Sequence, residues 1–185
     1  MKKVIILIAI AIVSFSVAVN AQNASATATQ SVSLDLSNAI SITFTGSGTS
    51  TGGAITLPFS TVSDYANGVT STAQQLKVQS NLAFDVAVKA NATNFTYTGT
   101  YTTGTTMPVS GVLKLMVSAN STGGSIASPF SGTAYATLTA TDQNLITSGT
   151  YGSNQLFSIQ YKAEPGFTYP AGTYTTSVVY TATQQ

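Results

Sequence analysis

Short segments in which apolar and polar residues alternate recur along most of the chain, between runs of glycine, serine, threonine and asparagine. In residues 156–163, for example, Phe157, Ile159 and Tyr161 share one parity, and polar side chains take the other. Because successive side chains of a β-strand point to opposite faces, each such segment can bury one face in a core. About eight to ten short strands, without a convincing amphipathic helix after the N-terminal segment, predict an all-β protein with an antiparallel sandwich or barrel.

The closing residues 167–185 contain a turn followed by the last predicted strand. Pro170 fixes its own φ and Gly172 tolerates positive φ, so the two residues favour a turn. The apolar residues that share one parity after this turn are Tyr174, Val178, Tyr180 and Ala182. We therefore expect one strand here, with one face in a core and one in water.

Alternation also begins early in the chain. Val32, Leu34 and Leu36 alternate with polar residues, and after Asn38 the pattern resumes in residues 40–44. This predicts either one long strand with a bulge or two short strands.

Two further segments in the middle of the chain give strand predictions. Residues 76–78 and 82–89 flank Ser80-Asn81, which predicts a hairpin. Residues 111–119 are apolar on both parities, as in a strand that is buried on both faces or lies next to a bulge.

The N-terminus has the features of an export signal. Lys2 and Lys3 precede an apolar run of residues 4–19, and small or modest residues follow it. The run is shorter than the roughly 20 residues that a membrane-spanning helix needs. We therefore expect residues 1–21 to be a cleaved signal peptide, residues 22–30 a flexible lead, and residues 31–185 a single domain. The protein is then secreted or exposed at the cell surface, without a membrane span.

Composition limits the partners and anchors that this chain can have. All six basic residues are lysines, and two of them belong to the predicted signal, which leaves four lysines against five carboxylates. Nucleic acids and anionic membranes bind clustered Lys and Arg, so they are poor partners for this chain. Cysteine is absent, which excludes disulfides and a lipid-anchored cysteine.

The residues that most enzymes use are missing. The chain has no histidine, cysteine or arginine, so we expect no enzyme and assign no catalytic, metal-binding or cofactor-binding residue. A carboxylate pair for glycoside hydrolysis is the enzymatic alternative. We interpret the charged residues Asp35, Asp85, Lys89 and Lys162 instead as solvent-facing strand positions. Asp142-Gln143-Asn144 offers oxygen ligands for calcium, but it is more typical of a turn.

Tyr97, Tyr101 and Tyr151 lie near threonine- and glycine-rich loops. Tyrosine rings in such loops can stack on sugar rings, and tyrosine is also an ordinary strand residue with an apolar body and a polar tip. A carbohydrate platform is therefore the less favoured of the two interpretations.

The closing turn carries a family resemblance. Residues 169–174, Tyr-Pro-Ala-Gly-Thr-Tyr, and the strand 178–183 resemble the ends of bacterial surface domains of the spore-coat-protein-U/fimbrial-subunit-like and WxL-like families. Residues 81–88 resemble a mid-domain strand of the same group. Without tryptophan the WxL motif is missing, and with it any inference of peptidoglycan binding; the cysteine pair of many fimbrial subunits is missing too. The resemblance implies an immunoglobulin-like sandwich at the cell surface and transfers no site.

The sequence thus predicts an exported, non-enzymatic structural or adhesive surface protein, of the kind found in fimbria-like assemblies. Its partners would be copies of itself or other surface subunits, joined by pairing of a terminal strand with an open sheet edge. The candidate strands are residues 22–36 and 173–185. The alternative is a carbohydrate- or cell-wall-binding module.

Overall fold

The computed structural model describes residues 25–185. Leu36–Gln185 forms one compact unit, and residues 25–35 belong to a second unit that contains no helix or strand in its described part. The predicted signal peptide, residues 1–21, lies outside the described residues, as does the start of the lead predicted over 22–30. Residues 25–30 are exposed to solvent.

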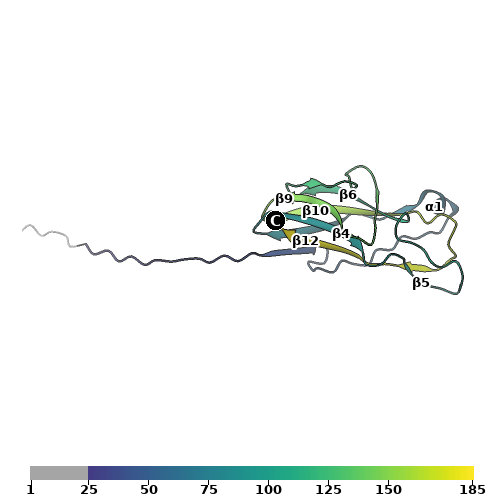
Figure 1. Ribbon diagram of the computed structural model, residues 1–185, viewed down its shortest axis with the longest axis horizontal. Coiled ribbons are helices and arrows are strands. Elements are labelled where there is room, and N and C mark those ends of the chain that lie inside the picture. The colour runs from purple at the N-terminus through teal and green to yellow at the C-terminus, as the bar shows by residue number, and fades with distance from the viewer. Residues whose placement is uncertain (1–24) are drawn as a thin grey trace, which may run out of the picture. The chain divides into compact units, whose positions relative to one another are not determined.

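Leu36–Gln185 is built from short antiparallel strands and one short helix. In chain order these elements are β1 (Ile40–Phe44), α1 (Val62–Asn67), β2 (Val69–Thr70), β3 (Gln74–Ser80), β4 (Phe84–Ala90), β5 (Thr96–Thr98), β6 (Leu113–Ser121), β7 (Ser125–Ile126), β8 (Ala136–Thr137), β9 (Gln143–Gly149), β10 (Gly152–Ala163), β11 (Thr173–Thr175) and β12 (Val178–Gln184). The larger sheet has the order β1-β3-β10-β6-β8, with β2 also paired to β10. The second sheet has the order β12-β4-β9-β7, and β5 and β11 form a small sheet at the same end of the domain as α1 (Figure 1).

The core lies between the two larger sheets and draws on both. Its fully buried side chains include Leu76 and Phe157 from the first sheet and Phe84, Val86 and Ile146 from the second. Strand alternation produces this arrangement directly, since the buried residues of β4 are every second one. The prediction of an all-β antiparallel sandwich is confirmed, and its immunoglobulin-like strand order stays a prediction.

The predicted hairpin of residues 76–89 is wrong in its pairing. β3 and β4 both form, but β3 pairs with β1 and β10, and β4 pairs with β12 and β9. The connection between them crosses from one sheet to the other, and the Ser80 hydroxyl donates to the Leu82 carbonyl within it. Each of the two strands has one apolar face, and both faces are buried because the strands lie opposite each other across the core.

The strand predicted at residues 32–36 is absent. Only the second half of the early alternation forms a strand, β1, which pairs with β3. Val32, Leu34 and Leu36 are 78%, 77% and 87% exposed, so among residues 25–185 their alternation corresponds to no buried face.

The closing strand is divided into β11 and β12. β11 pairs with β5, whereas β12 pairs with β4, and Thr176 and Ser177 lie between them. The Asn91 side chain holds this break, because its Oδ1 accepts hydrogen bonds from the Thr176 hydroxyl at 3.2 Å and from the Ser177 amide at 3.1 Å. The even-numbered residues of β12 face inward as predicted, and Val179 is exposed.

The strand predicted within the apolar run at residues 111–119 forms as β6 and lies next to a bulge. In β6, Leu113, Leu115 and Val117 are buried on one parity, and the register against β10 shifts between Ser158 and Ile159. Of the two structures that the run allowed, a strand next to a bulge is therefore the one that forms.

The helix α1 is a single capped turn. The Asp64 amide donates to the Thr61 hydroxyl, and the Asp64 carboxylate accepts from the Thr61 amide, which makes a capping box. Gly68, with a φ of 77°, ends the helix. Within residues 25–185, no helix has the length and apolar character that a membrane crossing requires.

Candidate functional site

A groove lies between β1 and β12, the edge strands of the two main sheets. We call it the β1–β12 groove; its volume is about 180 Å³, and it is lined by Ile42, Thr43, Phe44, Ser50, Leu76, Val178, Val179 and Tyr180. None of these lining residues is charged. Leu76 is a core residue, so the groove reaches from the open side of the sandwich to its interior. β1 and β12 run along the same side of the domain (Figure 1).

Tyr180 fixes the shape of this groove. Its ring lies edge-on to Phe44 with centroids 6.1 Å apart, and its hydroxyl lies 2.7 Å from the hydroxyl of Tyr161 inside the domain. Burial raises the pKa of Tyr161 to about 12, against the lowering effect of its hydrogen bond with Tyr180. Burial also raises the pKa of Tyr180 well above its usual value. The two phenols therefore stay neutral and bonded to each other at physiological pH.

Residues 31–36, which we call the extension, are the second part of the candidate site. Every residue of the extension is exposed, and Val32, Leu34 and Leu36 are its apolar members. Three large apolar side chains in a row of alternating positions are unusual on a solvated segment, because burying each one is favourable. The pattern is that of a strand with one face intended for a core.

Asn81 and Gln184 bind the chain just after the extension. Asn81 Nδ2 donates to the Ser37 carbonyl at 2.9 Å, and Asn81 Oδ1 accepts from the Ala39 amide at 2.9 Å. The Asn81 amide and Gln184 Nε2 both donate to the Ala39 carbonyl. These bonds continue the pairing of β1 with β3 beyond Ile40, so residues 37–39 run on in line with β1.

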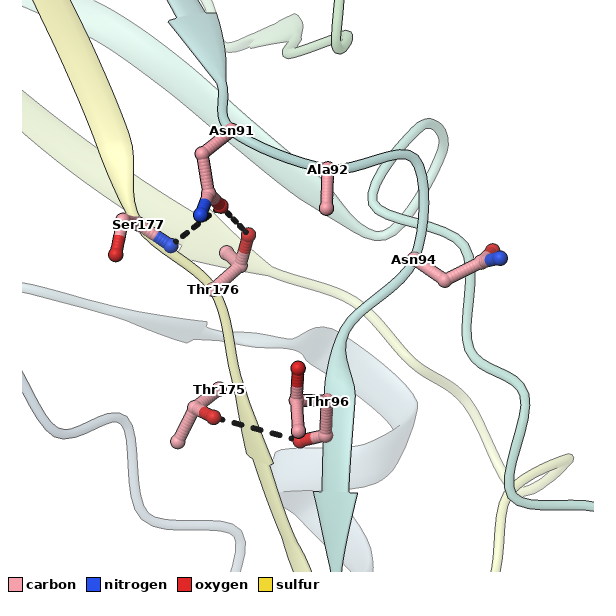
Figure 2. Close-up of a pocket in the computed structure, with 7 residues that line it drawn as sticks. All are labelled: Asn91, Ala92, Asn94, Thr96, Thr175, Thr176 and Ser177. Atoms are coloured by element: carbon pink, nitrogen blue, oxygen red, sulfur yellow. Dashed lines mark hydrogen bonds between the residues drawn. The ribbon is translucent and has the colours of Figure 1, made fainter.

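A second hollow, of about 150 Å³, is polar and lies where β4 leads toward β5 and β11 toward β12. Figure 2 shows that Asn91 points toward Thr176 and Ser177, while Asn94 points away from them. The Asn91 amide oxygen already accepts two hydrogen bonds from this wall, and no aromatic side chain lines the hollow. Its hydroxyl and amide groups thus hold the chain break between β11 and β12.

The three tyrosines considered for sugar binding do not form one platform. Tyr97 is half-buried, and its hydroxyl donates to the Ala171 carbonyl at 3.0 Å and accepts from the Tyr101 amide at 3.2 Å. Tyr101 is 54% exposed beside it, whereas Tyr151 lies in the turn between β9 and β10. Tyr97 therefore serves the fold.

Sequence reasoning missed a different aromatic pair. Phe167 is 67% exposed, and its ring stacks on Tyr65 of α1 with centroids 5.4 Å apart and an interplanar angle of 22°. The two residues are about a hundred positions apart in the chain and follow no common pattern, so no sequence signal joins them.

The charged residues are mostly occupied in pairs or hydrogen bonds. Asp85 accepts from the Ser148 amide and from Gln185, and Lys89 pairs with Asp142 at 3.0 Å. Lys114 and Lys162 both pair with Glu164, and these two partners lower the pKa of its carboxyl group. Asp35 is exposed.

Possible metal ligands are not clustered. Among residues 25–185, no group of three Asp, Glu, His or Cys side chains lies close enough together to hold a metal ion. In the segment considered for calcium, Asp142 is bound by Lys89, and the Gln143 side chain bonds to Thr139 and Thr137.

Comparison with protein-family models finds no match for this chain, and comparison with curated protein sequences finds none either.

Proposed function

We propose that this chain is an exported, non-enzymatic structural or adhesive subunit of the cell surface, which assembles with copies of itself through its extension. The observation that carries the proposal is the exposed alternation of Val32, Leu34 and Leu36. The predicted signal peptide, the absence of the usual catalytic side chains and the surface-domain resemblance of the closing turn support the same conclusion.

The energetics favour a partner that covers the extension. Burying a valine or leucine side chain contributes about 1.5–3 kcal/mol, so covering all three contributes roughly 4.5–9 kcal/mol. Association itself costs on the order of 4–15 kcal/mol, and main-chain hydrogen bonds at a sheet edge add to the gain. A strand added to an open sheet edge supplies both contributions at once.

The extension allows a matched test, because its residues are exposed on both parities. Val32→Asp/Leu34→Asp and Ser31→Asp/Ser33→Asp add the same charge on opposite faces of the segment. Static light scattering of the chain from Gln22 onward should show a molar mass that rises with concentration. The first variant should stay monomeric, and the second should associate like the parent. Parent protein that is monomeric at every concentration contradicts the proposal.

A carbohydrate-binding module is the second candidate function, and one observation favours it. The exposed Phe167 ring, held flat against Tyr65, has the form of a stacking surface for a sugar ring. Polysaccharide pull-down with Phe167→Ala, and with Tyr151→Ala as an exposed aromatic control, tests this alternative. Binding that Phe167→Ala abolishes and Tyr151→Ala leaves intact would support it.

A further inference from the structure

Two tyrosine rings meet across the small sheet of β5 and β11. Tyr97 and Tyr174 are register partners in this antiparallel pair, and their ring centroids are 5.0 Å apart. Aromatic pairs usually lie at about 4.5–7 Å, and no other pair in the described residues is as close. We propose that Tyr97 and Tyr174 form an oxidative cross-linking site, at which a peroxide-driven reaction joins the two rings as dityrosine.

Two glycines leave room for the rings to meet. Continued by one position, the register of β5 and β11 sets Gly99 opposite Gly172, on the same face of the sheet as the tyrosines. A Cβ added at Gly99 would lie 2.1 Å from the Tyr97 hydroxyl, and one added at Gly172 would lie 2.2 Å from Tyr97 Cε2. Both glycines therefore approach the Cε2 side of the ring, and Cε1 is the ortho carbon that they leave uncovered.

Main-chain carbonyls of the closing turn hold both phenols in place. The Tyr97 hydroxyl donates to the Ala171 carbonyl, and the Tyr174 hydroxyl donates to the Pro170 carbonyl, each at 3.0 Å. Dityrosine is joined through ring carbons ortho to the hydroxyls, so the cross-linked pair retains both hydroxyls and can retain both bonds. The rings are thus oriented before they react, which lowers the entropic cost of bringing them together.

The reaction balances with hydrogen peroxide as the oxidant and a haem peroxidase as the class of enzyme that uses it. Each phenol loses one hydrogen atom, and the two phenoxyl radicals form a carbon–carbon bond between ortho carbons. Each of these carbons then passes its hydrogen to the ring oxygen, which restores both phenols. The two hydrogen atoms that were removed reduce one peroxide to two water molecules. Burial and the neighbouring Tyr97 and Tyr169 raise the pKa of Tyr174, so its ring starts as a neutral phenol.

The other tyrosines are less well placed for a link within one chain. Tyr161 and Tyr180 meet through their hydroxyls, 2.7 Å apart, inside the domain. The ring of Tyr169 lies edge-on to Tyr174 at 6.3 Å. Tyr151 is 71% exposed in the turn between β9 and β10, and no other tyrosine ring in the described residues packs against it.

A cross-link at this position would tie down a part of the domain that lies outside the two main sheets. β5 and β11 have three residues each and pair only with each other within the described residues. Two strands alone are marginally stable in water. The chain has no cysteine, so a disulfide cannot close this segment. A bond between Tyr97 and Tyr174 would instead close a long loop and restrict the unfolded chain.

Peroxidase treatment tests the site. The chain from Gln22 onward is oxidised with hydrogen peroxide and a haem peroxidase, and its monomer is recovered by size exclusion in denaturant. We expect this monomer to have lost two hydrogen atoms by intact mass, and peptide mapping to find the peptides of Tyr97 and Tyr174 linked. Tyr174→Phe keeps the ring and should abolish the link, whereas Tyr169→Phe, the matched control on the same turn, should leave it.

Thermal melting gives a second readout. The oxidised monomer, refolded from denaturant, should melt about 5 °C or more above untreated protein carried through the same steps, because the link restricts the unfolded chain. Tyr174→Phe should show no such rise after oxidation, and Tyr169→Phe should show the same rise as the parent. A linked monomer that melts no higher than untreated protein contradicts the stabilising effect of the cross-link.

Three results overturn the site itself. They are a monomer without a link, a link from Tyr169 to Tyr174 in place of the proposed one, and links that form only between copies through the exposed Tyr101 or Tyr151. The oxidation is analysed in the separated monomer, whereas the light-scattering test of self-assembly depends on Val32 and Leu34. Either proposal can therefore fail without the other.

Discussion

Gly172 and Tyr97 form the contact on which the closing turn depends. A Cβ added at Gly172 would lie 2.2 Å from Tyr97 Cε2 and 2.9 Å from both Cζ and Oη. The ring has little freedom to withdraw, because its hydroxyl bonds to Ala171 and Tyr101, and because Gly99 lies against it on another side. Gly172 also has a φ of +156°, a backbone conformation that residues with a side chain rarely adopt.

The cost of Gly172→Ala follows from these contacts. The backbone strain costs about 1–2 kcal/mol. Displacing the Tyr97 ring loses two hydrogen bonds, at about 0.5–1.5 kcal/mol each. Alanine lowers the entropy of the unfolded chain, which offsets about 0.4–1 kcal/mol. We expect a net loss of about 2–4 kcal/mol, which lowers Tm by about 5–15 °C in a domain of this size.

Urea unfolding followed by circular dichroism measures this loss, with Gly111→Ala as the matched control. Gly111 has a φ of +86° and no atom within 4 Å of an added Cβ, so it reports backbone strain alone. In a Tyr97→Ala background the cost of Gly172→Ala should fall toward that of Gly111→Ala. Equal costs of Gly172→Ala with and without the Tyr97 ring would refute the steric reasoning.

Three further predictions concern ionisable groups. Burial raises the pKa values of Tyr161 and Tyr180, so the folded state keeps phenol protons that the unfolded state loses. The free energy of unfolding should therefore fall as pH rises from about 10 to about 12. In an absorbance titration, Tyr180→Phe should lose the phenol transition that occurs at the highest pH. The pKa of Asp64 is lowered because its carboxylate accepts hydrogen bonds from Ser60 and Thr61. Asp64→Asn should therefore lower the stability above pH 4, and its melting temperature should fall less than that of the parent when the pH is lowered below 4. Glu164→Gln removes two half-buried ion pairs, with Lys114 and Lys162, and should cost about 1 kcal/mol in chemical denaturation.

Strand existence was predictable where alternation was clean. Residues 40–44 and 156–163 lie in β1 and β10, with the predicted parity inward in β10. Alternation reports which side chains face a core, but it does not name the strand that pairs alongside. The predicted hairpin failed for this reason, because β3 and β4 keep their predicted faces while belonging to different sheets.

β9 shows a second limit. Its adjacent residues Leu145 and Ile146 are both fully buried, and its register against β4 shifts twice. Ser148 has a positive φ of 54° and donates its amide to Asp85. Such bulges break the period of two. The residue types of Asp142-Gln143-Asn144 predict a turn instead, but Gln143 and Asn144 begin this strand.

The candidate site was half predictable. The apolar alternation at Val32, Leu34 and Leu36 predicts a strand that does not form within the described residues, and donation of residues 22–36 to another copy stays a prediction. The β1–β12 groove was not visible in the sequence, because it joins residues more than a hundred positions apart.

Hydrogen exchange in the extension tests the central claim most directly. The amides of residues 31–36 belong to no strand within the described residues of one copy, so they should exchange rapidly in dilute protein. As concentration rises, alternate amides of the extension should become protected in the parent chain and stay unprotected in Val32→Asp/Leu34→Asp. Rapid exchange throughout the extension in protein that light scattering shows to be associated would contradict the account.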